Sequence, residues 1–172
     1  MFKNDIYICF SDGEDVKFSK KILSKKDKRK LKRSPNLKTN SSFITSRFLK
    51  NKAKKAKFSL SHKEKFAVVA FGKVRKLGVD MEILHKRDID GVMDFCFNEF
   101  ECELVKKADE KLQIFYQIYT LKEAVLKAKK LGFEFLGRVG LSKDGLLDEK
   151  GRKMFYKSYM IDKFIISIAF RY

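Results

Sequence analysis

Tryptophan is absent from this chain of 172 residues, and proline occurs only once. With one proline and nine glycines, the composition excludes collagen-like and glycine- or proline-rich disordered chains. No run of about 18 apolar residues occurs, so no membrane span is expected, and the first residues lack the apolar core of a signal peptide. The three cysteines are an odd number at no metal-ligand spacing, which favours free thiols in a reducing cytoplasm.

The residues that are present suit a soluble protein with a phenylalanine-rich core. Apolar residues make up 44% of the chain, and 17 residues are phenylalanine. A chain of this length can bury a core of its own. The composition therefore favours one compact domain or a pair of small ones.

Positive charge is concentrated in one segment. Of the 40 lysines and arginines, 17 lie between residues 17 and 57, where Asp27 is the one acidic residue. Such a surface raises the local concentration of polyanions and of acidic proteins. For any single lysine of the segment, an ordinary solvated surface is the alternative.

Two helices are predicted in this basic segment, separated by Pro35. Ser24 is a candidate N-cap for the first helix, and Asn40 or Ser41 for the second. The side of the second helix that we expect to be buried contains Phe43, Ile44, Phe48 and Leu49. The charged side chains of both helices are then left to face the solvent.

The acidic motif at residues 78–82 has the period of a β-strand. Apolar side chains at positions 79, 81 and 83 alternate with Asp80 and Glu82. A strand with this pattern places both carboxylates on the face opposite the apolar residues, roughly 6–7 Å apart. The ordinary alternative is a half-exposed strand with no ligand.

A second motif, residues 119–127, lies on a predicted amphipathic helix that spans about 110–129. Tyr119, Glu123 and Lys127 are spaced four residues apart, so they form one stripe beside the buried face of the helix. Glu123 with Lys127 is also the ordinary helix-stabilising pair of opposite charges.

If this helix packs beside the acidic strand, three carboxylates meet with a lysine next to them. Mg2+ takes oxygen ligands and is usually held by one or two carboxylates together with substrate phosphates. A lysine offsets charge on phosphate oxygens, and a carboxylate near the metal can accept a proton from a hydroxyl. We therefore expect a site for a divalent cation and a phosphate-rich ligand, with Asp80 and Glu123 facing the solvent.

Four blocks of the sequence resemble the signature of the 4′-phosphopantetheinyl transferases, in that family's order. Two of them are the acidic motifs at 78–82 and 122–127. The third is Ser61-His62 with the apolar stretch that follows, and the fourth is the stretch 96–101. The chain is most similar to the larger, two-half enzymes of the family, typified by the surfactin synthetase activator.

The resemblance implies that the phosphopantetheine arm of coenzyme A is transferred to a serine of an acyl or peptidyl carrier protein. The other product in this family is adenosine 3′,5′-bisphosphate. Because the chain is small and has no other domain attached, we expect a role in fatty-acid synthesis. By the match, Asp80, Glu82 and Glu123 would hold Mg2+, or Mn2+ in its place. Glu123 would also be the base, and Lys127, with Lys122 beside it, would contact the phosphate or the leaving group.

The resemblance also assigns coenzyme A contacts to the first part of the chain. Ser61 and His62 would lie at the adenosine end, with His62 near the 3′-phosphate. Further candidates for the 3′-phosphate are Lys28, Arg29 and Ser42. Carrier proteins are typically acidic, so the basic segment suits both the coenzyme and the carrier.

The chain departs from the family pattern in three places. Tyr119 replaces the tryptophan that usually opens the helical motif, and Lys130 replaces the first of two glycines after it. The Gly-Lys-Pro segment that normally precedes the Ser-His block is not recognisable. These departures concern the coenzyme contacts and the carrier specificity more than the metal site.

The expected fold is α/β (α+β), with two similar small halves, antiparallel sheets and, as the resemblance implies, the active site between the halves. We expect an N-terminal half over residues 1–76 on the 3′-phosphate side and a C-terminal half over residues 77–172 with the metal-binding motifs. Because one chain contains both halves, a monomer can be complete.

Local signals predict individual elements of the two halves. The strands are expected near residues 5–10, 57–61, 66–72, 78–83, 154–161 and 164–170, and a short helix over 88–95. Asn98 is a candidate N-cap with Glu101 three residues later, which is the spacing of a capping box. Lys143-Asp144-Gly145 indicates a hairpin turn.

Two alternatives to a transferase remain open from the sequence. One is a degenerate relative that binds coenzyme A or a carrier protein without transferring anything, which the departure at Lys130 favours. The other is a small basic RNA-binding protein with exposed aromatic residues such as Tyr156 and Tyr159. The RNA alternative leaves the carboxylate motifs unexplained, so a nucleic-acid partner is not expected.

Overall fold

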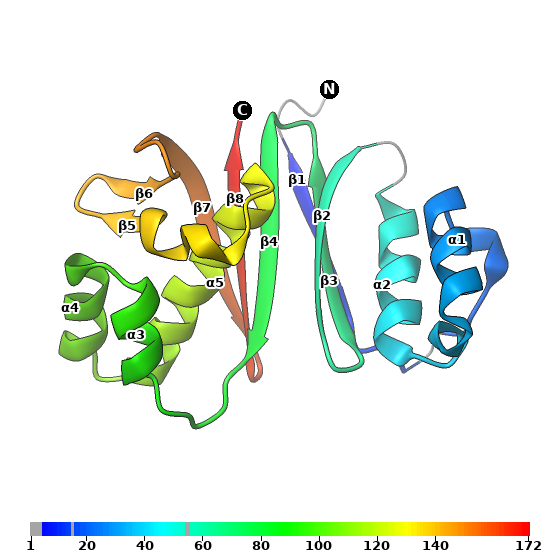
Figure 1. The fold of residues 1–172 in the computed structure, drawn as a ribbon, viewed down its shortest axis with the longest axis horizontal. Coiled ribbons are helices and arrows are strands. Elements are labelled where there is room, and N and C mark those ends of the chain that lie inside the picture. The colour runs from blue at the N-terminus through cyan, green and yellow to red at the C-terminus, as the bar shows by residue number, and fades with distance from the viewer. Residues whose placement is uncertain (1–4, 15, 54–55) are drawn as a thin grey trace. The chain divides into compact units, whose positions relative to one another are not determined.

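The computed structural model describes residues 5–14, 16–53 and 56–172. The chain divides into two compact units, Met1–Lys73 and Val74–Tyr172. Each unit is built on an antiparallel sheet with helices packed against it (Figure 1). The predicted mixed α/β fold with antiparallel sheets is therefore confirmed. In the part of the chain that the structure describes, no helix is both long and apolar enough to cross a membrane.

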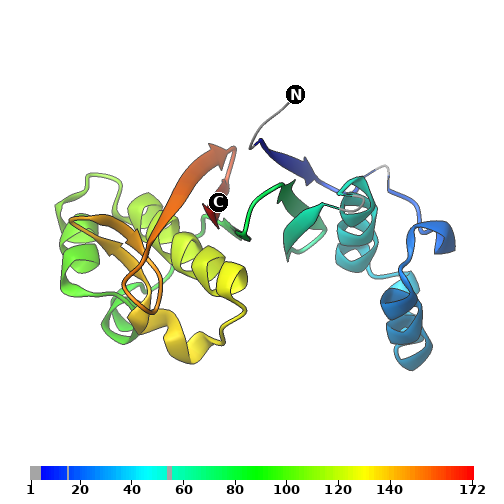
Figure 2. The ribbon, with the colours of Figure 1, turned by 90° about the horizontal axis from the view of Figure 1, so that it is seen from above.

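The first unit has a three-stranded sheet in the order β1-β3-β2. Its elements are β1 (Ile6–Ser11), η1 (Lys20–Ile22), α1 (Lys25–Arg33), η2 (Pro35–Lys38), α2 (Ser41–Lys52), β2 (Lys57–Lys63) and β3 (Phe66–Gly72). Helix α2 packs on the sheet through Leu49, which contacts Ala67 and Val69 in one apolar cluster. Helix α1 lies on the outer side of α2, away from the sheet (Figures 1 and 2). A second cluster, which includes Leu31 and Phe43, joins the two helices.

The two predicted helices of the basic segment begin at residues with capping side chains. Ser24 caps α1 in a capping box with Asp27, in which each side chain accepts a hydrogen bond from the other residue's backbone N–H. The side chain of Asn40 accepts from the backbone N–H of Phe43 at 2.7 Å, so Asn40 rather than Ser41 caps α2. These caps satisfy backbone donors that the first turn of a helix leaves without partners.

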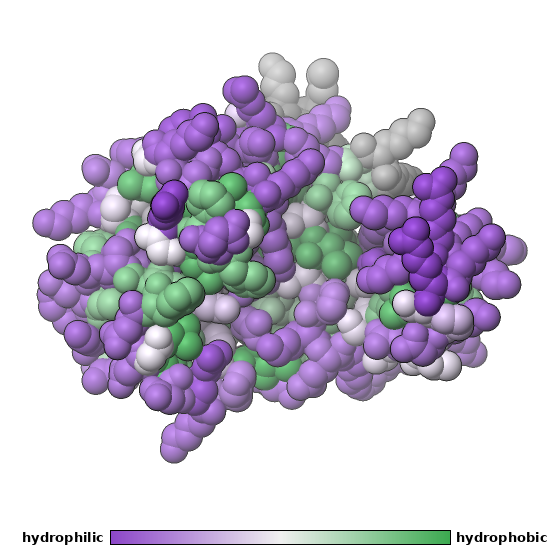
Figure 3. Space-filling model, viewed as in Figure 1, coloured by the Kyte–Doolittle hydropathy of each residue, from purple (hydrophilic) through white to green (hydrophobic). Residues whose placement is uncertain are grey.

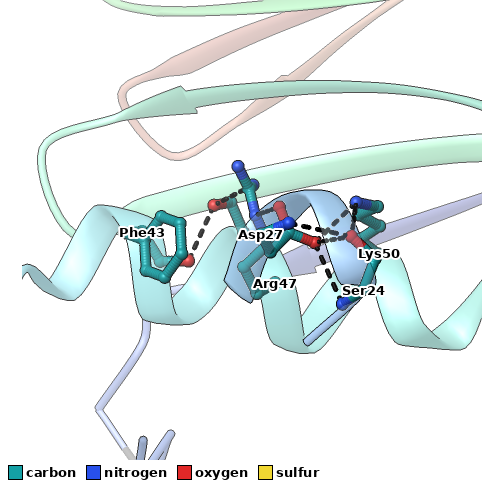
Figure 4. A network of polar contacts seen from close by, with 6 residues as sticks. Ser24, Asp27, Phe43, Arg47 and Lys50 are labelled. Atoms are coloured by element: carbon teal, nitrogen blue, oxygen red, sulfur yellow. Dashed lines mark hydrogen bonds and ion pairs between the residues drawn. The ribbon is translucent and has the colours of Figure 1, made fainter. Parts of the chain in front are cut away.

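Asp27 is the centre of an ion-pair network that holds α1 against α2 (Figure 4). Arg47 Nε donates to Asp27 Oδ1 at 2.6 Å, and Lys50 Nζ donates to Oδ2 at 2.8 Å. The Ser24 hydroxyl donates to the same carboxylate. Burial raises the pKa of Asp27, but hydrogen bonds from Lys50 and Ser24 and the charge of Arg47 outweigh it and lower the pKa to about 2.

Asp27→Asn is expected to destabilise the first unit by about 1–2 kcal/mol at pH 7, because the variant loses the ionised partner of two cations. Since the folded pKa lies below the unfolded value, this stabilisation is present above about pH 4 and is lost as the pH falls towards 2. Urea unfolding between pH 2 and pH 7 measures the difference. The exposed Asp162→Asn is the control, and equal stability of both variants at pH 7 would contradict the network.

The second unit has a five-stranded sheet in the order β4-β8-β7-β6-β5. Its strands are β4 (Lys76–Ile83), β5 (Gly140–Ser142), β6 (Gly145–Leu147), β7 (Lys153–Ile161) and β8 (Phe164–Arg171). Its helices are α3 (Asp90–Cys96), α4 (Glu99–Lys107), α5 (Lys111–Lys129) and η3 (Phe133–Arg138). Strands β5 and β6 form the predicted hairpin, in which Ser142 pairs with Gly145. Helix α5 packs on β4 and β8.

Gly78 allows α5 to approach β4 very closely. A Cβ atom added to Gly78 would lie 1.8 Å from the carbonyl oxygen of Ala124 and 2.7 Å from the backbone nitrogen of Ala128. The face of β4 that Gly78 occupies therefore lies directly against the backbone of α5. Because side chains alternate along a strand, Asp80 and Glu82 lie on this same face. The glycine of the acidic motif thus sets the distance between the two elements that carry the predicted site.

Lys130 is the C-cap residue of α5 and has the left-handed backbone conformation with φ 59°. Glycine is the residue that adopts this conformation without strain. The backbone N–H of Leu131 donates to the carbonyl of Leu126 at 3.0 Å, so the helix end is closed in spite of the lysine. The departure at Lys130 therefore leaves the end of the helix intact.

Candidate functional site

The acidic cluster consists of Asp80 and Glu82 on β4 and Glu123 on α5, with Lys127 one turn further along α5. Lys127 Nζ donates to Asp80 Oδ1 at 2.6 Å. Asp80 is 2% exposed, whereas the side chain of Lys127 is 33% exposed. The structure thus brings Asp80 of the first motif and Lys127 of the second together, with the charges of Asp80 and Glu82 acting on Glu123. The expectation that Asp80 faces the solvent was wrong, because α5 covers that face of the strand.

Glu123 has an environment that opposes its negative charge. Burial, the charge of Asp80 and the charge of Glu82 raise its pKa, while a hydrogen bond from Tyr119 and the charge of Lys127 lower it. The result is a pKa of about 7. The same burial, with the charge of Glu123, raises the pKa of the Tyr119 hydroxyl. Glu123 can therefore exchange a proton near neutral pH, and Tyr119 keeps its own proton to orient the carboxylate.

The donor atoms of the cluster fit a hard divalent cation. Among the described residues, no three His, Cys, Asp or Glu side chains stand close enough together to hold a metal ion as a preformed protein cage. Mg2+ does not need such a cage, since one or two carboxylates, substrate phosphates and waters usually complete its shell. The repulsion of Glu123 by Asp80 is the kind of unfavourable contact that a bound cation relieves. Asp80, Glu82 and Glu123 are the residues that would hold it.

Lys122 lies elsewhere, on the side of α5 that faces α4. Its ammonium donates to Glu101 Oε2 at 2.6 Å, and neither side chain has any solvent exposure. The ring of Phe97 lies 5.4 Å from the ammonium. The structure therefore does not bring Lys122 to the acidic cluster, because neighbouring helix positions point about 100° apart. The charge of Lys122 neutralises the buried carboxylate of Glu101.

Glu101 joins three elements of the second unit through one carboxylate. Besides pairing with Lys122, it completes the predicted capping box of α4 with Asn98. It also accepts a hydrogen bond from the backbone N–H of Leu141 in β5 at 2.8 Å. A Cβ atom at Gly140, whose φ is 147°, would lie 2.1 Å from Glu101 Oε1. This buried network fixes α5, and with it Glu123, relative to α4 and β5.

In the first unit, the candidate coenzyme residues Ser42 and His62 meet. Ser42 Oγ and His62 Nδ1 are hydrogen-bonded at 2.9 Å, and His62 is exposed. Ser61, the other half of the Ser-His motif, is 6% exposed. Adjacent residues of a strand point to opposite faces of the sheet, so Ser61 does not share the face of His62. Of the motif, His62 is the residue that a ligand could reach.

Lys28 and Arg29 line different hollows on the two sides of α1. Arg29 lines a cavity of about 670 Å³, the inner pocket, together with Arg33, Arg47 and Lys50. Lys28 lines a separate hollow on the other side of the helix. The two residues were predicted to contact the same phosphate, and the structure separates them because they are adjacent on a helix. Arg29 is the one that shares a pocket with Arg47 and Lys50.

Two groups of residues in the site region were not predicted from the sequence. The inner pocket contains Arg47 and Lys50, which lie 20 and 23 residues after their partner Asp27 in the sequence. The buried partner of Lys122 is also distant in the sequence. A serine followed three residues later by aspartate, as in Ser24 and Asp27, is the local signal that could have pointed to the first network.

Comparison with known proteins agrees with this geometry. The family model described as the 4′-phosphopantetheinyl transferase superfamily matches residues 76–156, which include the whole acidic cluster. A curated relative, the 4′-phosphopantetheinyl transferase HetI of Nostoc sp. (strain PCC 7120), is 32% identical over 88 residues. The matched part covers 49% of this chain but only 37% of HetI. The predicted resemblance to this superfamily is therefore confirmed.

Proposed function

From the match of residues 76–156 to the 4′-phosphopantetheinyl transferase superfamily, we propose that this protein transfers the 4′-phosphopantetheine arm of coenzyme A to a serine of an apo carrier protein. The reaction depends on Mg2+ and releases adenosine 3′,5′-bisphosphate. The observation that carries the proposal is the acidic cluster itself, in which carboxylates from β4 and α5 meet beside Lys127. The arrangement supplies what phosphoryl transfer needs, namely groups that neutralise phosphate charge and a base for the attacking hydroxyl.

In this reaction the serine oxygen attacks the phosphorus next to the pantetheine arm, and the bond from that phosphorus to the leaving bisphosphate breaks. Glu123 accepts the serine proton, directly or through a water, and its pKa of about 7 suits that role. Tyr119 holds the Glu123 carboxylate by a hydrogen bond. Lys127 offsets negative charge on the transferred phosphate or the leaving group. Asp80, Glu82 and Glu123 would hold Mg2+, which would supply neutralisation of phosphate charge.

The first unit has the residues suited to the adenosine end of coenzyme A. We assign binding of the adenosine end of coenzyme A to residues 1–76, and metal binding and phosphopantetheine transfer to residues 77–172. His62, oriented by its hydrogen bond to Ser42, is the contact for the 3′-phosphate. Arg29 is a separate candidate cation for the coenzyme, in the inner pocket. The substrate protein is an acidic acyl carrier protein of fatty-acid synthesis or a peptidyl carrier protein, and the free cysteines suit a cytoplasmic setting.

His62→Ala is expected to raise the Michaelis constant for coenzyme A by roughly tenfold with kcat nearly unchanged, because it removes one hydrogen-bonding contact to a phosphate far from the reacting atoms. Ser42→Ala should act in the same direction with a smaller effect, since it only releases the imidazole. Initial rates at varied coenzyme A and saturating carrier measure both constants. If the Michaelis constant for coenzyme A is unchanged in His62→Ala, His62 does not contact the coenzyme.

The proposed activity is tested by intact-protein mass spectrometry of an apo carrier protein incubated with this protein, coenzyme A and Mg2+. A gain of one phosphopantetheine group that EDTA prevents is the expected result. Folded protein that binds coenzyme A but modifies none of several acyl and peptidyl carriers would instead identify a binder without transferase activity.

A further inference from the structure

Residues 155–161 of β7, the β7 edge, lie at a side of the sheet that the proposed chemistry does not use. In the part of the chain that the structure describes, these residues pair with β8, whereas β6 pairs with β7 only at Lys153 and Met154 (Figure 1). Alternate residues of a strand direct their backbone N–H and C=O groups to opposite edges. The side of the β7 edge away from β8 therefore presents backbone groups that another extended segment can pair.

The side chains of the β7 edge are mostly apolar, and they are exposed on both faces of the sheet. The large exposed side chains are Phe155, Tyr156, Tyr159, Met160 and Ile161. Phe155 is 58% exposed on one face, and Met160 is 53% exposed on the other. An edge strand that is exposed and apolar is a site of association with another chain.

The chemistry of the β7 edge fits a second copy of the same strand. Ser158 is the midpoint of the edge, so two antiparallel copies related by a twofold axis at Ser158 use its whole length. Phe155 then lies opposite Ile161 of the other copy, and Tyr156 lies opposite Met160. Pairs of aromatic and aliphatic side chains across two strands stabilise a sheet.

Lys157, the one charged residue of the β7 edge, favours this register over its neighbours. With the axis at Ser158, Lys157 lies opposite Tyr159 of the other copy, and a cation beside an aromatic ring is attractive. With the axis one residue earlier, the two copies of Lys157 lie directly opposite each other, which is unfavourable. With the axis one residue later, the first two residues of the edge lie opposite the turn that ends the strand.

The second unit has a low net charge, which permits two copies of it to meet. Residues 74–172 contain 19 lysines and arginines and 16 acidic residues, a net charge of +3 out of +18 for the whole chain. Most of the positive charge belongs to the first unit, and Figure 3 shows the strongly hydrophilic surface over its helix α1. Repulsion between two second units is therefore weak. A nucleic acid or an anionic membrane would find only one cation on the β7 edge.

We propose that this chain forms a dimer in which two β7 edges pair antiparallel about Ser158 and join two five-stranded sheets into one. The acidic cluster lies on β4 and α5, and β8 lies between β4 and β7 in the sheet. None of the residues of the cluster belongs to the β7 edge, so each copy keeps its own cluster. Dimerisation is thus independent of the proposed transfer reaction.

Variants of the full chain test both the interface and its register. Tyr159→Lys places a second lysine opposite Lys157 at two symmetry-related positions and is expected to weaken the dimer about tenfold. Lys157→Glu/Tyr159→Lys places opposite charges at the same positions and should restore dimerisation. Phe95→Lys is the matched control, because it replaces an exposed aromatic residue of the same unit with the same change in charge. Thermal unfolding verifies that each variant is folded.

Analytical ultracentrifugation over a wide range of protein concentrations measures the association. Wild-type protein and Phe95→Lys are expected to reach twice the mass of the 20.2 kDa chain as the concentration rises. A single-chain mass at every concentration would overturn the inference, as would a dimer that is unaffected by Tyr159→Lys or not restored by the added Lys157→Glu. A wild-type monomer that binds single-stranded RNA or anionic vesicles, and loses this binding in Tyr156→Ser/Tyr159→Ser, would assign the β7 edge to that ligand instead.

Discussion

Glu123→Gln is expected to lower the rate of phosphopantetheine transfer by about a thousandfold, the size typical for loss of a general base. The amide cannot accept the serine proton, and it also removes one of the three anionic oxygen donors of the cluster. Rates are measured as the mass change of an apo carrier protein under single-turnover conditions, so that slow product release does not hide the chemical step. The exposed Glu103→Gln on α4 is the matched control and should react at the wild-type rate.

The same substitution is expected to leave the fold intact or to stabilise it. A carboxyl group whose pKa rises on folding destabilises the folded state above its unfolded pKa, and for Glu123 this cost grows between about pH 4 and pH 7. The neutral amide removes the repulsion by Asp80. An inactive variant with an equal or higher melting temperature at pH 8 would show that the carboxylate is kept for function. If Glu123→Gln transfers phosphopantetheine at the wild-type rate, the acidic cluster is not the active site.

Lys122→Met is expected to destabilise the second unit by about 3–5 kcal/mol, because it leaves the Glu101 carboxylate buried without its cation. Loss of activity in this variant alone would not distinguish a structural role from the phosphate contact that the motif predicts. The double variant Glu101→Gln/Lys122→Met removes both charges and keeps an acceptor for the backbone N–H of Leu141. It should recover most of the stability.

Activity of the double variant decides the role of Lys122. If Lys122 only positions α5, transfer should return together with stability, and the Michaelis constant for coenzyme A should stay near the wild-type value. A stable double variant with wild-type coenzyme binding but no transfer would instead place the Lys122 ammonium in the chemical step. Urea unfolding and the carrier mass assay on the same samples separate these outcomes.

Local patterns were sufficient for the elements that carry the site. The alternation around Asp80 and the stripe of Glu123 and Lys127 each depend on residues a few positions apart, so periodicity alone places them on a strand and a helix. The caps at Ser24 and Asn98 depend on equally short spacings. Such features are visible in a single sequence because the interacting groups are neighbours along the chain.

Contacts between residues that are far apart along the chain could not be predicted from the sequence patterns. Lys122 was expected beside the phosphate because it adjoins Glu123, but its partner Glu101 lies 21 residues earlier and on another helix. Asp80 was expected to face the solvent, since nothing in the strand pattern shows that Gly78 brings the backbone of α5 against that face. Lys28 and Arg29 were treated as one group, although adjacent helix positions diverge by about 100°.

The most direct test of the central claim quantifies both products of one reaction. Apo acyl carrier protein, coenzyme A and Mg2+ are incubated with this protein, and phosphopantetheinylated carrier is measured by mass spectrometry while adenosine 3′,5′-bisphosphate is measured by chromatography. The account predicts equal molar amounts of the two products with the wild-type protein, and both products at about a thousandth of that rate with Glu123→Gln. Bisphosphate release without carrier modification, or carrier modification at the wild-type rate in Glu123→Gln, would contradict it.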